Sequence, residues 1–303
     1  MSIAALASVI FGVLGYVAIG VALRLTGMLS PNDAKPLNTV LIYVALPALV
    51  FTTVQPAEVS LELVAIPALG WVIAVSGLAL AWVCVRLLKL QGAAAGAFLL
   101  AAAFGNTGYI GYPVASALLG DPGLVRAIFY DIFGNTAAIV TIGSMVASRF
   151  GEHGLKVNPI KEIVTFPPFI ALAVALVLRS VPVPSAVMDW LGVLGKLVVP
   201  LIMVSVGLSL QPGRLREHLP VVSAIAAIKL LVLPLLAWGL GTLLLADPAS
   251  VRVLVLEAGV PSMMLTVVVG TRFRLDVDVI ASAILVTTVG AIVTIPLLQV
   301  LVG

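Results

Sequence analysis

The stretch that decides the fold is Gly105-Asn106-Thr107-Gly108-Tyr109-Ile110-Gly111-Tyr112-Pro113, in the middle of a long apolar segment. Pro113 has no backbone N–H and clashes with the preceding helical turn, and the glycines before it weaken a helix further. Backbone groups freed there cannot face lipid, because each unsatisfied group costs several kcal/mol. We therefore expect a broken membrane helix whose open backbone, with Asn106 and Thr107, faces protein or a wet cavity. A proline kink that only shapes helix packing is the alternative.

The composition is that of a membrane protein. Of the 303 residues, 62% are hydrophobic and 10% charged, whereas a soluble domain is about half apolar and a quarter charged. The net charge of +3 fits basic residues gathered in cytoplasmic loops, so we expect no nucleic-acid partner. Cys84 is the single cysteine, and His153 and His218 lie in polar loops. We therefore expect no disulfide, no metal site and no cofactor.

Apolar segments of about 20 residues recur along the chain, as membrane-spanning helices require. The first of them, within residues 1–26, lacks a basic start and a cleavage motif, so we interpret it as a membrane helix rather than a signal peptide. The sequence predicts an all-α membrane protein with ten spans, at about 3–25, 36–54, 61–85, 93–118, 124–148, 160–179, 188–209, 219–245, 250–270 and 279–301.

Lys and Arg residues of the loops fall mainly on one side of the membrane under this assignment. The loops after odd-numbered spans hold eleven of them: Arg24, Lys35, Arg86, Lys89, Arg149, Lys156, Lys161, Arg214, Arg216, Arg272 and Arg274. The opposite loops hold three, which are Arg126, Arg179 and Arg252. Because basic loops stay in the cytoplasm, we expect an integral protein of the cell (inner) membrane with both termini outside.

Matching residues recur in the two halves at offsets of 148–156 residues. The pairs are Pro47 with Pro200, Gln55 with Gln211, Trp82 with Trp238, and Pro113 with Pro261. Five spans per half would make the second half enter the membrane from the opposite side. The sequence thus predicts an inverted repeat, with residues 1–150 as the first unit and 151–303 as the second, a plan typical of secondary transporters. Chance similarity between apolar helices is the alternative.

The second half has its own candidate break, at Glu257-Ala258-Gly259-Val260-Pro261-Ser262. Two interrupted helices at matching positions indicate a transport site. The N-terminal ends of the resulting half-helices would carry free N–H groups and partial positive charge, which favour a carboxylate or similar anion.

Four charged residues lie well inside predicted spans: Asp131, Lys196, Lys229 and Glu257. Charges at such depth usually face a cavity or a partner. Asp131 shares a helix face with Asn135, four residues on, and Glu257 precedes Pro261 by the same interval. We expect Asp131 and Glu257 to couple transport to a proton or a cation. A structural pair of Lys229 with Glu257 or Asp131 is the alternative, and Lys196 is expected to reach the membrane interface.

At Asn106-Thr107-x-x-x-Gly111-x-Pro113, the chain resembles the auxin efflux carrier family, which includes the plant PIN proteins and bacterial permeases for malonate and other organic acids. The stretch from Glu257 through Ser262 and Arg272-Phe273 to Thr294-Ile295-Pro296 is similar to the C-terminal part of that family. The likeness covers the whole chain. Two departures are the missing long hydrophilic loop of plant members and Glu257, where a small or polar residue is expected.

The resemblance implies two broken helices, spans 4 and 9, that cross at the membrane midplane near Pro113 and Pro261. It implies a scaffold of spans 1, 2, 6 and 7, through which members often form a homodimer, and a mobile transport domain of spans 3–5 and 8–10. The residues that it places at a substrate site are Asn106, Thr107, Gly111, Pro113, Asn135, Pro261 and Ser262.

We therefore expect a secondary active transporter that moves a small organic anion, auxin- or malonate-like, by an elevator mechanism, with a proton or sodium as the coupling ion and lipid as its surroundings. A sodium-coupled symporter or a cation/proton exchanger of similar fold is the first alternative. An intramembrane enzyme is the second, and the sequence speaks against it, because no nucleophile–base pair and no HExxH motif lies at depth.

Overall fold

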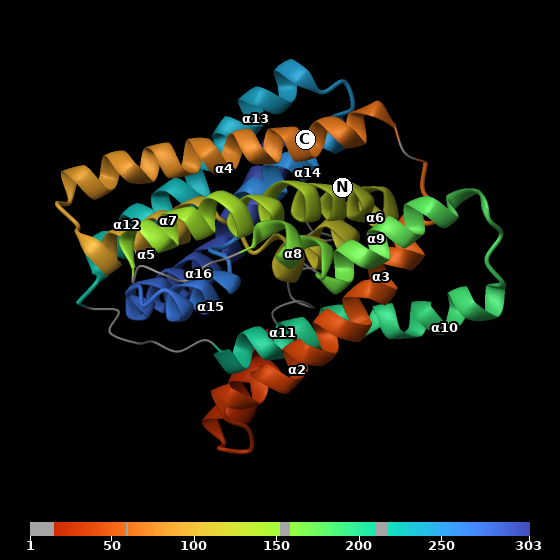
Figure 1. Ribbon diagram of the computed structural model, residues 1–303, viewed down its shortest axis with the longest axis horizontal. Helices are drawn as coiled ribbons and strands as arrows, with labels where there is room; N and C mark the ends of the chain where they lie inside the picture. The colour runs from red at the N-terminus through yellow and green to blue at the C-terminus, as the bar shows by residue number, and fades with distance from the viewer. Residues whose placement is uncertain (1–14, 59, 152–157, 210–216) are drawn as a thin grey trace. The chain divides into compact units, whose positions relative to one another are not determined.

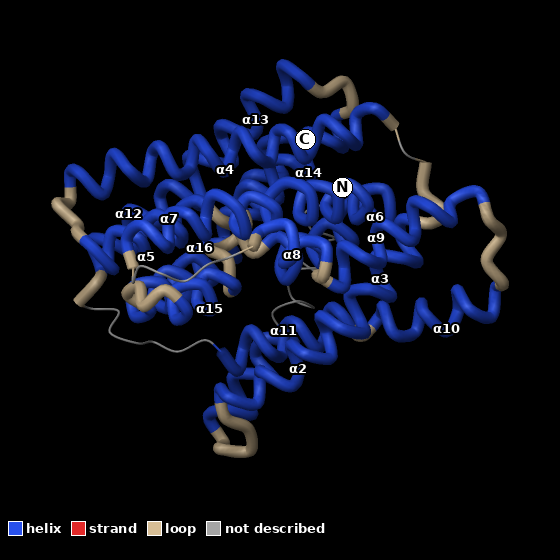
Figure 2. The backbone as a smooth tube through the Cα atoms, viewed as in Figure 1, coloured by secondary structure: helices blue, strands red, loops and turns tan. Residues whose placement is uncertain are grey.

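The computed structural model describes residues 15–58, 60–151, 158–209 and 217–303. Within these ranges the chain is helical, and the single strand-like feature is an isolated bridge between Gly105 and Ser262 (Figure 2). Some predictions concern residues outside the described ranges. These are residues 3–14 of the first span, His153, Lys156, and the Gln211-Pro212-Gly213 turn with Arg214 and Arg216.

Six helices of the described part are long and apolar enough to cross a membrane: Pro31–Val54, Glu62–Leu87, Thr107–Phe150, Ser185–Ser209, Leu219–Leu244 and Val277–Val302. Three shorter apolar helices are Gly15–Leu25, Gly92–Ala103 and Pro167–Ser180. The chain is therefore an integral membrane protein. The count of ten spans stays a prediction, because predicted spans 4 and 9 are each divided. The second part of span 4 is joined to the start of span 5 in α6 (Tyr112–Phe129), across a kink at Gly120 with φ 66° and ψ −163°.

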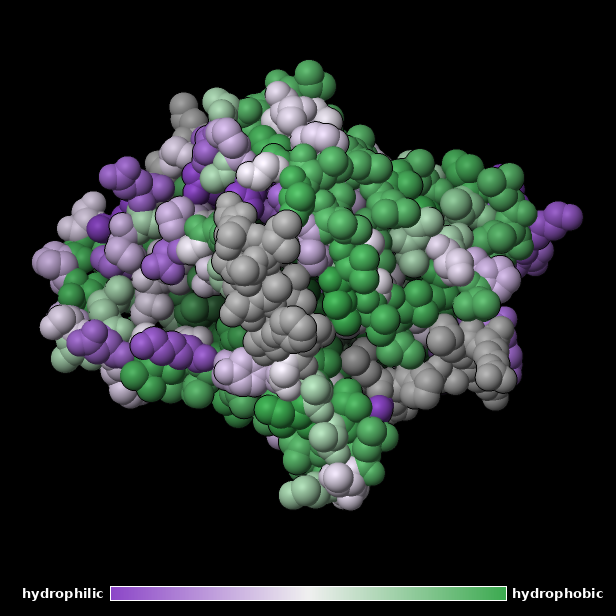
Figure 3. All heavy atoms as spheres, turned by 180° about the vertical axis from the view of Figure 1, so that it is seen from behind, coloured by the Kyte–Doolittle hydropathy of each residue, from purple (hydrophilic) through white to green (hydrophobic). Residues whose placement is uncertain are grey.

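Large apolar side chains cover much of the outer surface of these helices. Val83, Leu243, Val293 and Leu297 are each more than half exposed, and Figure 3 shows wide apolar areas on one face of the molecule. Apolar patches of this extent are rare on soluble monomers. Lipid tails are the environment in which they carry no penalty.

The chain forms two compact units. Unit 1 contains Met1–Val59, Tyr112–Ile128 and Ile160–Leu210, and unit 2 contains Ser60–Gly111, Phe129–Pro159 and Gln211–Gly303. Unit 1 thus collects predicted spans 1, 2, 6 and 7, and unit 2 collects spans 3, 5, 8, 9 and 10 with the first part of span 4. The segment 112–128 is the exception, since it holds the second part of span 4 and the first residues of span 5 but belongs to unit 1.

In unit 1, two glycines bring the Gly15–Leu25 helix against α11. A Cβ on Gly20 would collide with the carbonyl oxygen of Val204, and one on Gly207 would collide with that of Val17. Close backbone approach of this kind is typical of packed membrane helices. The elements of the unit are η1 (Pro31–Asp33), α2 (Ala34–Val40), η2 (Leu41–Ala45), α3 (Leu46–Val54), α6 (Tyr112–Phe129), α8 (Pro159–Val164), α9 (Pro167–Val177), η6 (Leu178–Ser180), α10 (Ser185–Lys196) and α11 (Val198–Ser209).

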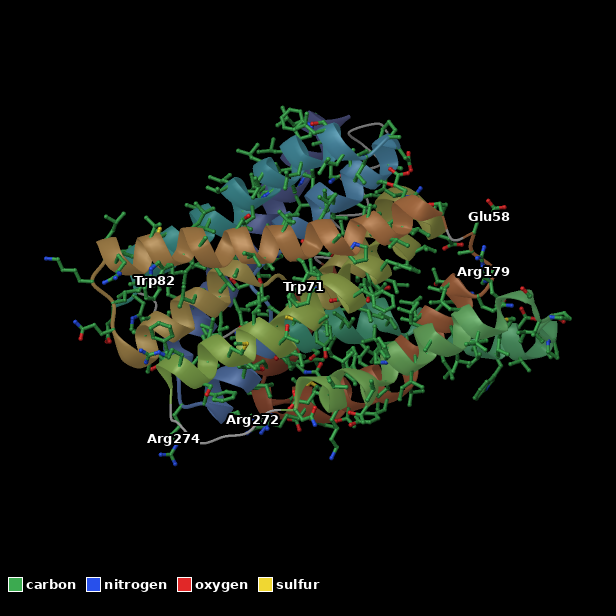
Figure 4. The ribbon with its side chains drawn as sticks, turned by 45° about the horizontal axis from the view of Figure 1, so that its top comes forward. Glu58, Trp71, Trp82, Arg179, Arg272 and Arg274 are labelled. Atoms are coloured by element: carbon green, nitrogen blue, oxygen red, sulfur yellow. The ribbon has the colours of Figure 1, made fainter. Side chains whose placement is uncertain are left out.

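Unit 2 is built around α4 (Leu61–Leu87), the long helix in Figure 1. The indole N–H of Trp71, near the middle of α4 (Figure 4), donates to the Phe133 carbonyl at 2.9 Å and so ties α4 to η4. The other elements are α5 (Gly92–Ala103), η3 (Thr107–Gly111), η4 (Tyr130–Thr136), η5 (Ile139–Gly143), α7 (Ser144–Phe150), α12 (Leu219–Ala227), η7 (Ile228–Val232), α13 (Leu233–Leu244), α14 (Pro248–Gly259), α15 (Leu265–Arg272) and α16 (Val277–Val302).

Candidate functional site

The helix of predicted span 4 is interrupted at residues 104–106, here called the first break. Helix α5 ends at Ala103, and Phe104 is extended, with φ −102° and ψ 130°. The chain becomes helical again at Thr107 in a wide π-type turn, η3. Its first hydrogen bonds come from the N–H groups of Ile110 and Gly111, which both donate to the Asn106 carbonyl.

The helix of predicted span 9 is interrupted at residues 260–264, the second break. Helix α14 ends at Gly259, and Val260 is extended, with φ −64° and ψ 155°. This is the conformation that a following proline favours, so Pro261 explains where α14 stops. Helix α15 begins at Leu265. Both interruptions predicted from the sequence are therefore present.

The two breaks pair with each other inside unit 2. The N–H of Asn106 donates to the Pro261 carbonyl at 2.8 Å, and the N–H of Met263 donates to the Phe104 carbonyl at 3.0 Å. These two bonds enclose the antiparallel bridge between Gly105 and Ser262. Backbone groups that left the helical ladder thus find partners in each other, as a low-dielectric surrounding requires.

The two paired breaks, here called the crossing, leave little room for a side chain at position 105. A Cβ there would stand 2.8 Å from the Lys229 Nζ and 2.8 Å from a methyl group of Val260. The missing side chain therefore allows the second break and the lysine to approach the first break closely.

Two side chains from other helices satisfy the backbone groups that the pairing leaves over. The Asn135 amide donates to the Gly105 carbonyl at 2.8 Å and to the Thr107 hydroxyl at 2.9 Å, and its oxygen accepts from the Gly105 N–H at 3.3 Å. On the other break, the Thr287 hydroxyl accepts from the Ser262 N–H at 3.0 Å. Asn135 and Ser262, predicted as substrate ligands, are thus engaged in holding the crossing together.

Asp131 lies at the N-terminal end of η3. Its Oδ1 accepts hydrogen bonds from the hydroxyls of Thr107 at 2.5 Å and Thr136 at 2.8 Å. Its Oδ2 is 3.1 Å from the place that a Cβ on Gly108 would take. A carboxylate is stabilised at the positive end of a helix. One of the two half-helix ends expected to attract an anion is therefore already occupied by the protein's own carboxylate.

Lys229 lies at the opposite, negative helix ends. Its ammonium group donates to the Ala258 carbonyl at 2.7 Å, in the last turn of α14, and only 2% of the residue is exposed. It is also close to Gly105, just after the end of α5. Cations are favourable at helix C-termini. The lysine is therefore bonded to a helix end rather than to Glu257.

Glu257 is fully buried, and neither of its carboxyl oxygens has a hydrogen-bond partner among the described residues. The carboxyl group lies against Gly111, where a Cβ would collide with it. Asp131 and Lys229 are close enough for their charges to act on it. A buried carboxyl group without partners is costly and calls for a functional explanation.

Asn106 is the predicted ligand whose side chain remains free. It is 4% exposed, and its amide makes no hydrogen bond to any residue that the structure describes. Its backbone, by contrast, is bonded on both sides. The amide offers two N–H donors and one acceptor at the point where both helices stop.

The crossing lies at a different place in the first half than we expected. It involves Gly105 rather than Pro113, which is eight residues further on, in α6 and in unit 1. The physical reason is that the π-type turn of η3 precedes Pro113 and accommodates its missing N–H, so the helix continues through the proline. Unit 2 brings the other predicted residues together: Asn106, Thr107, Gly111, Asn135, Pro261, Ser262, Asp131, Glu257 and Lys229.

Sequence reasoning missed two members of this site, Thr287 and Thr136. Thr287 follows Asn135 by 152 residues, an offset within the range of the proposed repeat. The offset was a usable signal, because each of the two side chains satisfies the break of its own half. Thr136 carried no signal, since a threonine inside a membrane helix usually bonds its own backbone.

Comparison with known proteins gives relatives along the whole chain. A transporter of Methanothermobacter thermautotrophicus, named as uncharacterized, is 34% identical over 95% of both chains. A second such transporter, of Methanocaldococcus jannaschii, is 33% identical over 95% of this chain and 96% of its own. A protein of Rhizobium meliloti is 27% identical over 88% of this chain and 86% of its own, and is named "Putative malonate transporter".

These names describe membrane transporters and not enzymes. The sequence pattern of the family described as membrane transport proteins, which is the auxin efflux carrier family, matches residues 2–159 and 152–299. With matches over nearly the full length and two broken helices that pair inside one unit, the chain belongs to this family of membrane transport proteins.

Proposed function

We propose that the protein is a secondary active transporter of a small organic anion of the malonate type, and that the solute binds at the crossing. The observation that carries the proposal is the free amide of Asn106, buried where two interrupted helices meet. Paired breaks of this kind form the solute sites of many transporters. The name of the Rhizobium meliloti relative supports malonate as the first solute to test.

The donors available to the solute carboxylate come from two sources. One is the Asn106 amide, and the other is the start of α15. There the N–H groups of Thr266 and Val267 already donate to the Met263 and Met264 carbonyls, which leaves those of Met264 and Leu265 for a solute. The start of η3 contributes less, because Asp131 already neutralises it. This asymmetry favours a solute held mainly through its polar contacts with Asn106 and the second half-helix.

The division of the chain supports an elevator-type movement. Unit 2 contains the whole crossing together with Asn135 and Thr287, whose side chains bond to its backbone. The site can therefore move as one body with these hydrogen bonds intact. Unit 1 contains the spans that would form the scaffold, and we propose that a homodimer, where it forms, uses them. We also propose that the ten spans form a five-plus-five inverted repeat and that both termini lie outside. Arg272, the last residue of α15, and Arg274 just after it (Figure 4) would then face the cytoplasm.

A cation/proton exchanger is the second candidate, and one observation favours it. Asp131 and Glu257, from different halves of the chain, lie in one unit and act on each other electrostatically. Paired carboxylates of this kind suit cation exchange. Sodium or potassium flux against a proton gradient, without any effect of organic anions, would support that function instead.

The experiment for the anion transporter is a thermal-shift titration of the purified protein with malonate, with the neutral malonamide as a chemical control. A bound solute stabilises the folded form by about 2.7 kcal/mol at 100 times its Kd. We expect malonate but not malonamide to raise the melting temperature. Asn106→Ala should abolish the shift, whereas Asn32→Ala, the same change at an exposed position of η1, should keep it. An equal shift in the Asn106→Ala protein would contradict the proposed site.

A further inference from the structure

The charges of the crossing do not balance unless one more positive charge is present. Unit 2 holds two carboxyl groups and one ammonium group near each other: Asp131, Glu257 and Lys229. With all three ionised, the cluster would carry one net negative charge. Uncompensated charge is strongly unfavourable in a buried, low-dielectric place.

The hydrogen bonds of the three groups indicate which of them carries the additional positive charge, as a bound proton. Asp131 accepts from two hydroxyl groups, as an ionised carboxylate does. Lys229 donates to the Ala258 carbonyl, as an ammonium group does. Glu257 is the exception, since both of its oxygens are completely buried and accept nothing from any described residue. An ionised carboxylate without donors is far more costly to bury than a neutral carboxyl group.

Among the described residues, Asp131 and Lys229 are the charged groups that act on Glu257. The titratable groups that act on it are Asp131 and Tyr130 from η4 and Lys229 from η7. Helix α13, which packs along α14, has no titratable residue. The titratable residues of the other long neighbours lie in the end turns of those helices: Glu62, Cys84, Arg86 and Asp278. Gly111, which lies against the carboxyl group, has no side chain and so brings no charged or polar side-chain group to it.

We infer that Glu257 is the coupling residue and that the coupled ion is a proton, which is bound in the conformation described here. The inference rests on the proposed function, and it narrows the pair Asp131 and Glu257 to one residue and the choice between proton and sodium to the proton. Asp131 stays ionised and positions η3 through Thr107.

Proton and solute are linked through the short connection between Glu257 and Asn106. Glu257 lies against Gly111, and the Gly111 N–H donates to the Asn106 carbonyl at 3.3 Å. A proton on Glu257 makes the cluster neutral, so that an anion can bind beside it. Loss of the proton restores a negative charge that repels the anion. Anion and proton are therefore bound and released together, as in a symporter.

The first test needs no substrate. Infrared spectra of the purified protein at neutral pH should show the carbonyl stretching band of a protonated, buried carboxyl group. The band should vanish in Glu257→Gln and persist in Glu62→Gln. Glu62 is the matched control because its carboxylate, unlike that of Glu257, has a hydrogen-bond donor, the Asp247 N–H at 3.0 Å. Absence of the band in the unaltered protein, or its persistence in Glu257→Gln, would overturn the inference even where one variant folds poorly.

The second test uses radiolabelled malonate in proteoliposomes. Glutamine imitates the protonated carboxyl group, so Glu257→Gln should still exchange malonate across the membrane but lose accumulation driven by a proton gradient. Glu62→Gln, the control of the infrared test, lies outside the crossing and should retain gradient-driven accumulation. Accumulation in Glu257→Gln equal to that of the unaltered protein, or dependence on sodium alone, would refute proton coupling at Glu257. No binding or exchange by the unaltered protein, with the infrared band present, would refute the proposed substrate and leave the proton on Glu257 standing.

Discussion

Replacing Asn135 with alanine should destabilise unit 2 more than any ordinary polar substitution in a membrane helix. The Asn135 side chain makes three hydrogen bonds to the first break: to the Gly105 carbonyl at 2.8 Å, to the Thr107 hydroxyl at 2.9 Å and from the Gly105 N–H at 3.3 Å. Alanine would leave both backbone groups of Gly105 buried without these partners. Because each orphaned group costs about 1–2 kcal/mol, we expect a loss of about 2–4 kcal/mol.

The measurement is the free energy of unfolding in mixed detergent micelles, followed by far-ultraviolet circular dichroism. Thr141→Ala is the matched control, because Thr141 lies further along the same continuous helical run and its hydroxyl bonds only to the carbonyls of Ala137 and Ala138. That control should cost less than about 1 kcal/mol, near the average for hydrogen bonds within membranes. Equal losses in the two variants would refute the view that Asn135 holds the break in place.

Two further predictions concern the other contacts of the crossing. Gly111→Ala should lower the free energy of unfolding by about 1–3 kcal/mol and abolish transport, because the new methyl group would displace the Glu257 carboxyl group. The control is Gly239→Ala, where an added Cβ would have nothing within 4 Å. It should be neutral or slightly stabilising in the same thermal and uptake assays. Thr287→Val should cost about 1–2 kcal/mol of unfolding free energy, because it orphans the serine N–H of the second break. Thr271→Val, at an exposed hydroxyl bonded only within its own helix, should change little, and an equal effect of the two threonine substitutions would contradict the prediction.

The membrane character of the chain and its two interrupted helices could be predicted because they depend on local chemistry. Long apolar segments require lipid, and Val260 before Pro261 forces an extended residue that ends α14. The first break was predicted within Gly105–Pro113 and its crossing point near Pro113, whereas the structure has the crossing at the start of that stretch, at Gly105. Proline is a strong signal against a helix, but a wide turn upstream, here η3, can accommodate it.

The arrangement of the charged residues could be foreseen only in part. Depth in the membrane singled out Asp131, Lys229 and Glu257, since charges there need partners. Which partners they have depends on the crossing of segments about 150 residues apart. Lys229 is bonded to a helix end and Asp131 to two threonines, whereas Glu257 is left without donors. Spacing along one helix cannot show this.

The roles of the polar residues divide in a way that only the folded chain reveals. Asn135 and Ser262 carried the same signal as Asn106, a polar side chain at a break. In the structure their hydrogen-bonding groups are used by the crossing itself, as in the bond from the Ser262 hydroxyl to the Ala101 carbonyl at 2.7 Å. Asn106 alone among these three keeps a free side-chain amide.

The central claim is that the solute is held where the two broken helices meet, and initial-rate uptake of radiolabelled malonate into proteoliposomes tests it most directly. The unaltered protein and Asn32→Ala should show saturable uptake. Asn106→Ala should reconstitute in equal amount, with an unchanged melting temperature in the absence of solute, and take up malonate no faster than empty liposomes. Saturable uptake by Asn106→Ala at the rate of the unaltered protein would contradict the account.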